Sequence, residues 1–352
     1  MRLFVKRSVT SLAVVLFAFA GFYAYWMMAP PAQTCASCHE IEGAHERWTQ
    51  SAHRDVTCTE CHGTALSTGL HSLREKARMV TTHLSSERPE VLGLTEAQVL
   101  ETMARCESCH AREYADWLSS GHSTTYAGIF LDKSHNAQER LTDSCLRCHG
   151  MFFEGNVSDL VQPLDVQGPW MLVDAAMAST PTIPCLACQP IHVQGSPAVR
   201  PDYANPSTIA ALREARVARV GFYDRYEKMH FSAEDLPVLT PSQAGDPVQV
   251  SLDVHQRVCV QCHAPNAFHQ AGSSDDRTPR GVHEGLSCAA CHDAHSNEAA
   301  PSCVNCHPRL SNCGLDVAVM NTTALDPASA NNIHFVACAD CHDQAFLTNH
   351  GR

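Results

Sequence analysis

Cysteine and histidine recur in this chain in one fixed pattern, Cys-x-x-Cys-His. The pattern occurs eight times, whereas the composition alone predicts far less than one occurrence. Its cysteines are Cys35, Cys38, Cys58, Cys61, Cys106, Cys109, Cys145, Cys148, Cys259, Cys262, Cys288, Cys291, Cys303, Cys306, Cys338 and Cys341. Its histidines are His39, His62, His110, His149, His263, His292, His307 and His342.

This spacing suits covalent attachment of a metal-bearing ring. Two thiols three residues apart lie on one helical turn, so both can form thioethers with the same porphyrin. The histidine that follows can then bind the iron. Zinc sites and disulfides also use paired cysteines, but neither explains a histidine directly after every pair. The eight motifs therefore predict eight haems c.

A ninth copy of the pattern departs at its last position. Cys185 and Cys188 keep both thioether positions, but Gln189 follows them in place of histidine. We expect a ninth haem here that lacks its motif ligand; the alternative is a decayed site with free or disulfide-bonded thiols. The one cysteine left over, Cys313, is expected to be a small buried apolar residue, with a thiolate haem ligand as the alternative.

The histidines outside the motifs can supply the second axial ligands. Of the 22 histidines, 14 lie outside, enough for two-histidine ligation at every haem. Iron ligation is predicted for His53, His71, His83, His122, His192, His230, His255, His269, His283, His295 and His334. The spares are His45, His135 and His350. For any single one of these histidines, a surface or core role is the alternative.

Spacing refines these assignments. Trp48-x-x-Ser51-x-His53 and Trp117-x-x-Ser120-x-His122 are two copies of one pattern, which suggests a helix that carries a distal histidine to another haem. A second group precedes a motif cysteine by about one helical turn. It consists of His255, His283 and His334.

His192 and His295 form a third group. His295 lies three residues after His292, as His192 lies three after Gln189. By that parallel, His192 is expected to ligate a neighbouring haem and not to replace the histidine missing at Cys185 and Cys188.

The N-terminus predicts the cellular compartment. Arg2, Lys6 and Arg7 precede an uncharged stretch, Ser8–Met28, whose length matches the ~20 residues of a membrane-spanning helix. The positive charge would keep that end in the cytoplasm. We expect an uncleaved anchor in the inner (cytoplasmic) membrane with the bulk of the chain on the periplasmic side; the alternative is a cleaved signal peptide.

Composition and motif density indicate the fold class. A net charge of −12 argues against nucleic acid as a partner. We expect a mostly α-helical, haem-packed multihaem protein with long loops and one N-terminal transmembrane helix. Helices are expected over 71–86 and, in a motif-free stretch, from Ile209 past Phe222 to an end near Pro237.

Four segments are predicted from the distribution of the motifs along the chain. Residues 1–30 are the anchor, and 31–100 hold two haems. Residues 101–245 hold three haems, including the atypical one, and 246–352 hold four.

The N-terminal part resembles the NapC/NirT-type membrane-anchored quinol dehydrogenases. The resemblance rests on an anchor followed by Cys35-Ala-Ser-Cys-His39, then by Trp48…Ser51…His53 and the second motif. Those proteins imply a quinol or membrane reductase as donor. Glu40 and Glu42, close to the anchor in the sequence, could take up quinol protons; the alternative is a pair of solvated carboxylates. A methionine ligates the first haem in one branch of that family, but Ile41 occupies this position here, so His39 becomes the expected ligand.

From Cys106 the chain resembles the superfamily of cytochrome c nitrite reductase and hydroxylamine oxidoreductase. The residues that carry the resemblance are the motif of His110 followed by Glu113, Tyr114, Trp117, Ser120 and His122.

Two functions remain open at this point. The first is transfer of electrons from a membrane quinol or reductase to an extracytoplasmic redox protein. The second is an enzyme that acts on a small nitrogen or sulfur compound at the Cys185/Cys188 haem. Such an enzyme needs acid and cationic groups nearby, for which Tyr223, Arg225, Tyr226 and His230 are the candidates. The alternative for these four is a polar helix face and one distal ligand.

Overall fold

The computed structural model describes about two thirds of the chain, in two compact units. The described residues are 2–28, 36, 39–64, 72–84, 93–193, 202–205, 220–238, 242–243, 246–247, 249–263, 283–296, 303–307, 309–310 and 316–317. The first unit consists of residues 1–109 and 191–196, and the second of residues 110–190 and 197–352.

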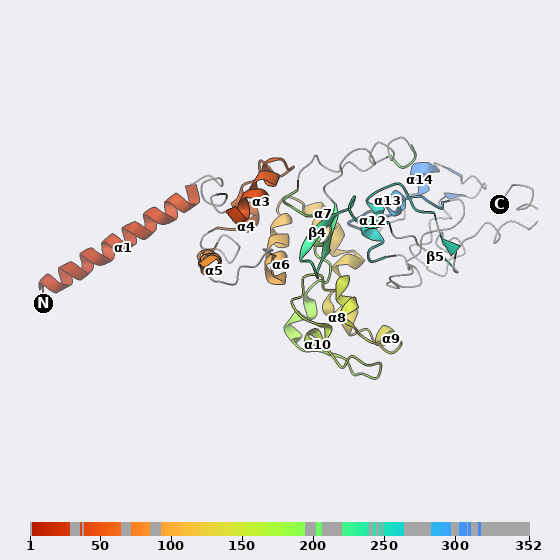
Figure 1. Ribbon diagram of the computed structural model, residues 1–352, viewed down its shortest axis with the longest axis horizontal. Coiled ribbons are helices and arrows are strands. Elements are labelled where there is room, and N and C mark those ends of the chain that lie inside the picture. Colours follow the sequence, from red (N-terminus) through yellow and green to blue (C-terminus); the bar gives the residue numbers. More distant parts are fainter. Residues whose placement is uncertain are drawn as a thin grey trace, which may run out of the picture. The chain divides into compact units, whose positions relative to one another are not determined.

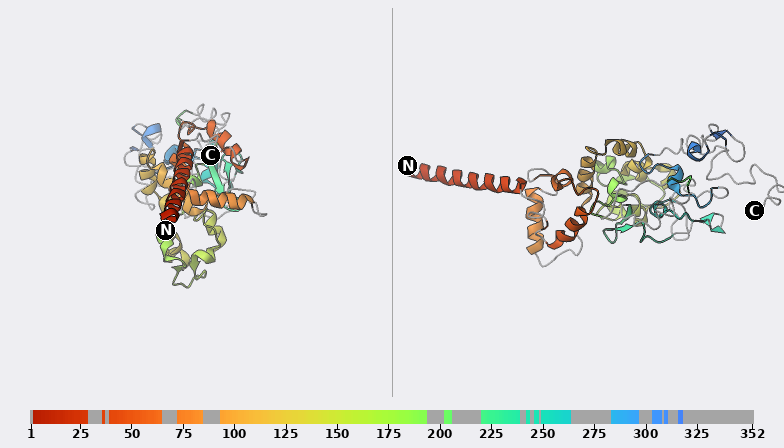
Figure 2. Two further views of the ribbon diagram at one scale, coloured as in Figure 1. Left: turned by 90° about the vertical axis from the view of Figure 1, so that its left-hand side faces the viewer. Right: turned by 90° about the horizontal axis from the view of Figure 1, so that it is seen from above.

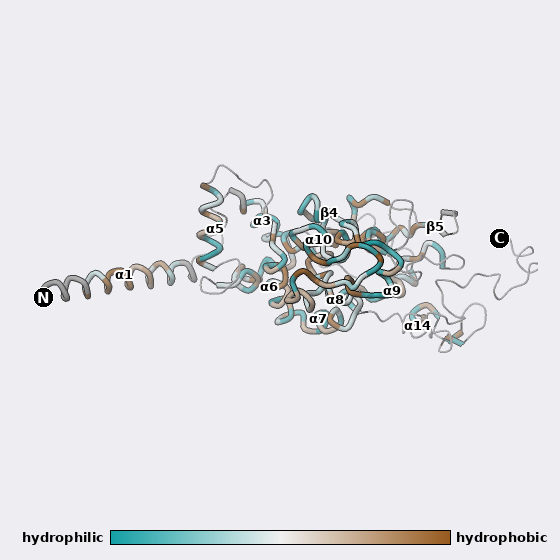
Figure 3. Tube along the Cα trace, turned by 90° about the horizontal axis from the view of Figure 1, so that it is seen from below, coloured by the Kyte–Doolittle hydropathy of each residue, from teal (hydrophilic) through white to brown (hydrophobic). Residues whose placement is uncertain are grey.

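The first unit is helical in its described part. Its helices are α1 (Arg2–Met28), α3 (His39–Thr49), α4 (Cys58–His62), α5 (Leu73–Leu84) and α6 (Glu96–Cys106). The helix expected over 71–86 is α5, and Figure 3 shows both hydrophilic and hydrophobic residues along it. Helix α6 begins with a capping box, in which Thr95 and Gln98 satisfy each other's backbone N–H groups. It packs against α4.

Helix α1 forms where the sequence predicts a helix, and it is continuous (Figure 2). The prediction that it spans a membrane is wrong, however. Among the residues that the structure describes, no helix combines the length and the apolarity of a membrane span.

The second unit consists of short helices and two-stranded antiparallel sheets. Its helices are α7 (Ala111–Leu118), η1 (Gly121–Ser123), α8 (Tyr126–Phe130), α9 (Lys133–Asn136), η2 (Asp143–Arg147), α10 (Val157–Leu160), η3 (Ala175–Ser179), η4 (Cys185–Ala187), α12 (Gln256–Cys259), α13 (Cys288–Cys291) and α14 (Cys303–Cys306). Its strands are β1 (Val161–Gln162), β2 (Met171–Leu172), β3 (Gly221–Asp224), β4 (Met229–Ser232), β5 (Ser242–Gln243) and β6 (Asp246–Pro247). The pairs are β1 with β2, β3 with β4, and β5 with β6.

A small hydrophobic core lies between α8 and α10, which are close together in the ribbon (Figure 1). Tyr126 and Phe130 of α8 are fully buried against Leu146 of η2 and Leu160 of α10. Leu146 stands between the two cysteines of a motif. The core therefore holds one attachment site directly.

The motif-free stretch is a β-hairpin over 221–232, not the helix that the sequence predicts. In the turn, the Asp224 carboxylate accepts hydrogen bonds from the N–H groups of Tyr226 and Glu227, and Lys228 has a φ of 52°. An aspartate that binds the backbone two residues on favours a turn over a helix. Residues 206–219, which hold the first part of the predicted helix, lie outside the described residues.

Candidate haem-attachment sites and axial ligands

The motifs adopt helical turns. In four of the intact copies, the N–H of the motif histidine donates to the C=O of the first cysteine, at 2.8–2.9 Å. These four histidines are His149, His263, His292 and His307. A further copy, that of Cys58, is the whole of α4. The two thiols of each pair are thus on one turn, as two thioether bonds to one ring require.

The atypical motif has the same backbone. The N–H of Gln189 donates to the C=O of Cys185 at 3.0 Å, and the N–H of Cys188 donates to the same oxygen at 3.3 Å. The β3–β4 hairpin packs on this turn, and the N–H of Gly221 donates to the C=O of Cys188 at 2.9 Å. A Cβ at Gly221 would lie 2.6 Å from the Phe231 carbonyl oxygen, so only glycine fits.

Three motif histidines each lie beside a histidine from elsewhere in the same unit. The ring centroids of His62 and His192 are 5.8 Å apart. Those of His122 and His263 are 6.1 Å apart, and those of His283 and His307 are 6.2 Å apart. Metal–imidazole bonds are ~2.0–2.1 Å long, and the ring centroid lies about 1 Å beyond the ligating nitrogen. Two rings on opposite sides of one ion therefore have centroids about 6 Å apart. The three pairs have this spacing.

The distal members of these pairs have lowered pKa values, which favours the neutral form that binds metals. Burial lowers the pKa of His122, and the nearby His263 and His295 lower it further. Burial also lowers the pKa of His192, with a contribution from Arg47. The pKa of His283 falls for the same reason, with His307 contributing.

The two Trp-x-x-Ser-x-His segments have the same local structure. In each, a helix ends at or just after the tryptophan, in α3 and in α7. The serine hydroxyl donates to the tryptophan carbonyl at 2.8 Å in both copies. It also accepts from the histidine N–H, at 3.1 Å in the first copy and 3.2 Å in the second. The pattern thus presents His53 and His122 in the same way.

Thiols from four motifs of the second unit lie close together. Cys148 hydrogen-bonds to Cys262, which raises the pKa of Cys262, and burial raises it further. A hydrogen bond with Cys288 lowers the pKa of Cys259. Burial raises the pKa of Cys188 to about 12, with Cys259 contributing. Rings attached at these sites would be close neighbours.

Arg147 joins two attachment sites, a role that the sequence reasoning missed. It stands between the cysteines of one motif, and its guanidinium donates to the side-chain Oε1 of Gln261 at 2.9 Å and to the Gln261 carbonyl. Gln261 is the matching residue of another motif. Arg147 also lies over the ring of Phe222, 4.7 Å from its centroid.

Asp253 is a second group that the sequence reasoning missed. Its side chain is 0% exposed, and it accepts from His255 Nδ1 at 2.8 Å, Ser287 Oγ at 2.6 Å and Tyr203 OH at 2.7 Å. Burial alone would raise its pKa, but these hydrogen bonds lower it to about 2. The only signal in the sequence is a carboxylate two residues before a predicted ligand.

Three of the four catalytic candidates in the hairpin, Tyr223, Arg225 and His230, take part in its packing. Arg225 donates to the carbonyl oxygens of Phe153 and Gly155, and Tyr223 stacks on Phe152 with ring centroids 4.0 Å apart. His230 Nε2 lies 2.5 Å from the Leu186 carbonyl oxygen. Tyr226 is largely exposed. These contacts favour a structural role.

Several predicted site residues lie outside the described part of the chain. They are Cys35, Cys38, His71, His269, Cys313, His334, Cys338, Cys341, His342 and His350. Among the described spares, His135 is on α9 with a half-exposed side chain, 3.8 Å from Glu139.

The residues present fit haem. Within the described residues, no group of three or more ligating side chains could hold a bare metal ion, whereas a haem iron needs only two axial ligands from the protein. The side-chain amide of Gln256, next to His255, is 1% exposed and has no hydrogen-bond partner among the described residues. A buried amide needs a polar partner, and the carboxylates of a bound haem would supply one.

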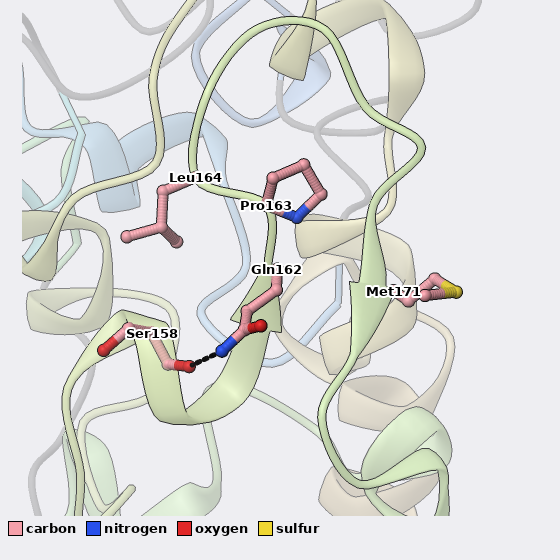
Figure 4. Close-up of a pocket in the computed structure, with 5 residues that line it drawn as sticks. All are labelled: Ser158, Gln162, Pro163, Leu164 and Met171. Atoms are coloured by element: carbon pink, nitrogen blue, oxygen red, sulfur yellow. Dashed lines mark hydrogen bonds between the residues drawn. The ribbon is translucent and has the colours of Figure 1, made fainter.

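A shallow pocket elsewhere in the second unit offers no comparable chemistry. Its lining side chains are not titratable, and the amide of Gln162 donates to the Ser158 carbonyl at 3.2 Å (Figure 4). The lining residues are Ser158, Gln162, Pro163, Leu164 and Met171.

The chain is similar to one known protein family. The family described as cytochrome c554 and c-prime matches residues 105–161 and 223–294, about a third of the chain. These segments contain the motifs that end at His110, His149, His263 and His292. The class of protein that this match supports is a multihaem c-type cytochrome, which binds haem c and transfers electrons. No curated protein and no solved structure matches.

Proposed function

We propose that this protein is a nine-haem carrier that passes electrons from a quinol or a quinol-linked reductase to an extracytoplasmic redox protein. The location follows from the chemistry, because haem of the c type is attached outside the cytoplasm. The proposed donor follows from the NapC/NirT-like residues of the first two motifs. The proposal also includes the resemblance of the middle of the chain to the superfamily of cytochrome c nitrite reductase and hydroxylamine oxidoreductase.

The observation that carries the proposal is the set of imidazole pairs. His62 with His192, His122 with His263, and His283 with His307 have the spacing of two ligands on one iron. An iron with two histidine ligands has no free position for a substrate, and this favours electron transfer over catalysis. The contacts between thiols of different motifs support short distances between haems, which a carrier needs.

The residues of the chain have separable roles in this function. When bound, haem c supplies an iron that cycles between the ferric and ferrous states. The motif cysteines hold the ring, and the paired histidines hold the iron from both sides. The Asp253 carboxylate accepts a hydrogen bond from Nδ1–H of His255, which leaves Nε2 of that ring for an iron. Arg147 and Gln261 keep two attachment sites together.

The proposal is tested on the full chain, matured in a host that attaches haem c. The mass of the intact protein gives the number of covalent haems, and a spectroelectrochemical titration gives their potentials. We expect nine haems, all reduced reversibly and all reducible by a quinol-linked donor. The matched variant Cys145→Ala/Cys148→Ala is expected to lose one haem. Absence of covalent haem, or haems that a quinol-linked donor fails to reduce, would contradict the proposal.

A further inference from the structure

We propose that His295 replaces the missing motif histidine at the Cys185/Cys188 site and is an axial ligand of the haem iron there. The inference rests on the proposed function in one respect, the presence of covalent haem at these two cysteines. It goes beyond the sequence-based expectation, in which His295 is a distal ligand with no assigned haem and no particular histidine is assigned as the replacement for Gln189.

The first step concerns the position of Gln189. Its N–H donates to the C=O of Cys185 at 3.0 Å, whereas the corresponding bond of His149 is 2.9 Å and that of His263 is 2.8 Å. The backbone of the atypical motif therefore follows that of the intact motifs. The side chain of Gln189 leaves the backbone where the imidazole of an intact motif does.

The second step concerns what this side chain contacts. The Nε2 atom of Gln189 lies 3.1 Å from the Nε2 atom of His295. Two nitrogens that bind one iron from opposite sides are about 4 Å apart, since each metal–nitrogen bond is ~2.0–2.1 Å. The contact is too short for an iron between the two groups. His295 therefore approaches the site on the side of Gln189, which is the side that the motif histidine would occupy.

The third step concerns how His295 is held. The carboxylate of Asp293 accepts from the N–H of His295 at 2.8 Å and from that of Ser296 at 3.1 Å. The same oxygen is 4.0 Å from His295 Nδ1. The turn thus places Nδ1 near the carboxylate and directs Nε2 to Gln189. Imidazole is a good ligand for haem iron, and the amide of Gln189 is a poor one, so His295 is the ligating group of the pair.

The consequence is a haem whose attachment and ligation come from separate parts of the chain. In the intact motifs, ring and ligand are carried by the same five residues. Here the ligand is 106 positions away in the sequence from Gln189. Ligation at this haem depends on the tertiary structure that brings the turn after α13 to η4.

The test uses the haem-loaded full chain and two readouts, the electron paramagnetic resonance spectrum of the ferric protein and the potential of each haem. In His295→Gly, we expect the ferric signal of one haem to change and one potential to rise. Free imidazole at millimolar concentration is expected to reverse both changes. The matched control is His135→Gly, an exposed histidine of the same unit, which is expected to change neither readout.

Two further variants identify the haem. In His295→Gly/Gln189→His, the restored motif is expected to recover the original signal without imidazole. In a chain that also lacks Cys185 and Cys188, His295→Gly is expected to have no effect. The proposal is overturned if the spectra of His295→Gly and the wild type coincide. It is also overturned if imidazole restores the signal of His295→Gly but the added Gln189→His substitution does not. A mass of eight haems, with all eight reduced reversibly, would overturn it and leave electron transfer in place.

Discussion

The two Trp-x-x-Ser-x-His segments have the same local hydrogen bonds but different surroundings. In the second unit, Trp117 is 5% exposed and its indole N–H donates to the Ile183 carbonyl at 3.0 Å. In the first unit, Trp48 is half-buried and packs on the ring of His45. A short sequence pattern determines how a histidine is presented, and the packing around it determines how firmly it is held.

The largest expected effect comes from the ligating histidine of the buried copy. His122→Ala removes the imidazole that faces His263, so we expect one haem to change from low spin to high spin. Electron paramagnetic resonance of the ferric protein measures this change. His135→Ala is the control and is expected to leave all haems unchanged.

The double variant His53→Ala/His122→Ala extends this comparison to the other copy. It is expected to change two haems, because each imidazole is predicted to serve its own iron. A change confined to one haem would show that the two copies do not have the same role.

The tryptophans are expected to differ in their effect on stability. Trp117→Ala removes a buried ring and its hydrogen bond to Ile183, so the free energy of unfolding should fall by about 3–5 kcal/mol. Trp48→Ala removes a half-buried ring and should cost about half as much. Denaturant unfolding of the two variants checks the difference. Equal losses would mean that both copies are packed alike.

The smallest effect is expected at the serines, and here the two copies should agree. Ser51→Ala and Ser120→Ala each remove one hydrogen bond to a tryptophan carbonyl and one from a histidine N–H. Each should lower the free energy of unfolding by about 1 kcal/mol. Thermal unfolding of matched samples provides the measurement, and a difference well beyond this value would argue against a shared local structure.

Local features of this protein could be predicted from the sequence. The spacing of the cysteines predicts helical turns, and the turns are present at Cys58, Cys259, Cys288 and Cys303. A helix does precede each Trp-x-x-Ser-x-His histidine, α3 and α7, but it ends four residues before the histidine and does not carry it. These features depend on residues three or four positions apart, and their types and spacing are visible in the sequence.

The features that depend on distant residues could not be predicted. Nothing in the spacing shows that His192 faces His62, because their contact follows from the path of the chain between them. The hairpin over 221–232 was predicted as a helix, since its apolar residues are also compatible with helical spacing. The apolar N-terminal stretch predicts a membrane span, which no helix in the described part of the chain forms.

Asp253 connects three stretches of the second unit that are far apart in the sequence. It contacts Tyr203, 50 residues earlier, and Ser287, 34 residues later, together with His255 beside it. A buried carboxylate that loses one hydrogen-bond donor destabilises the fold. These stretches are therefore expected to open together and not one at a time. In a hydrogen-exchange experiment, the backbone amides of 253–259 and 287–291 should then share one opening free energy and report a single cooperative unit.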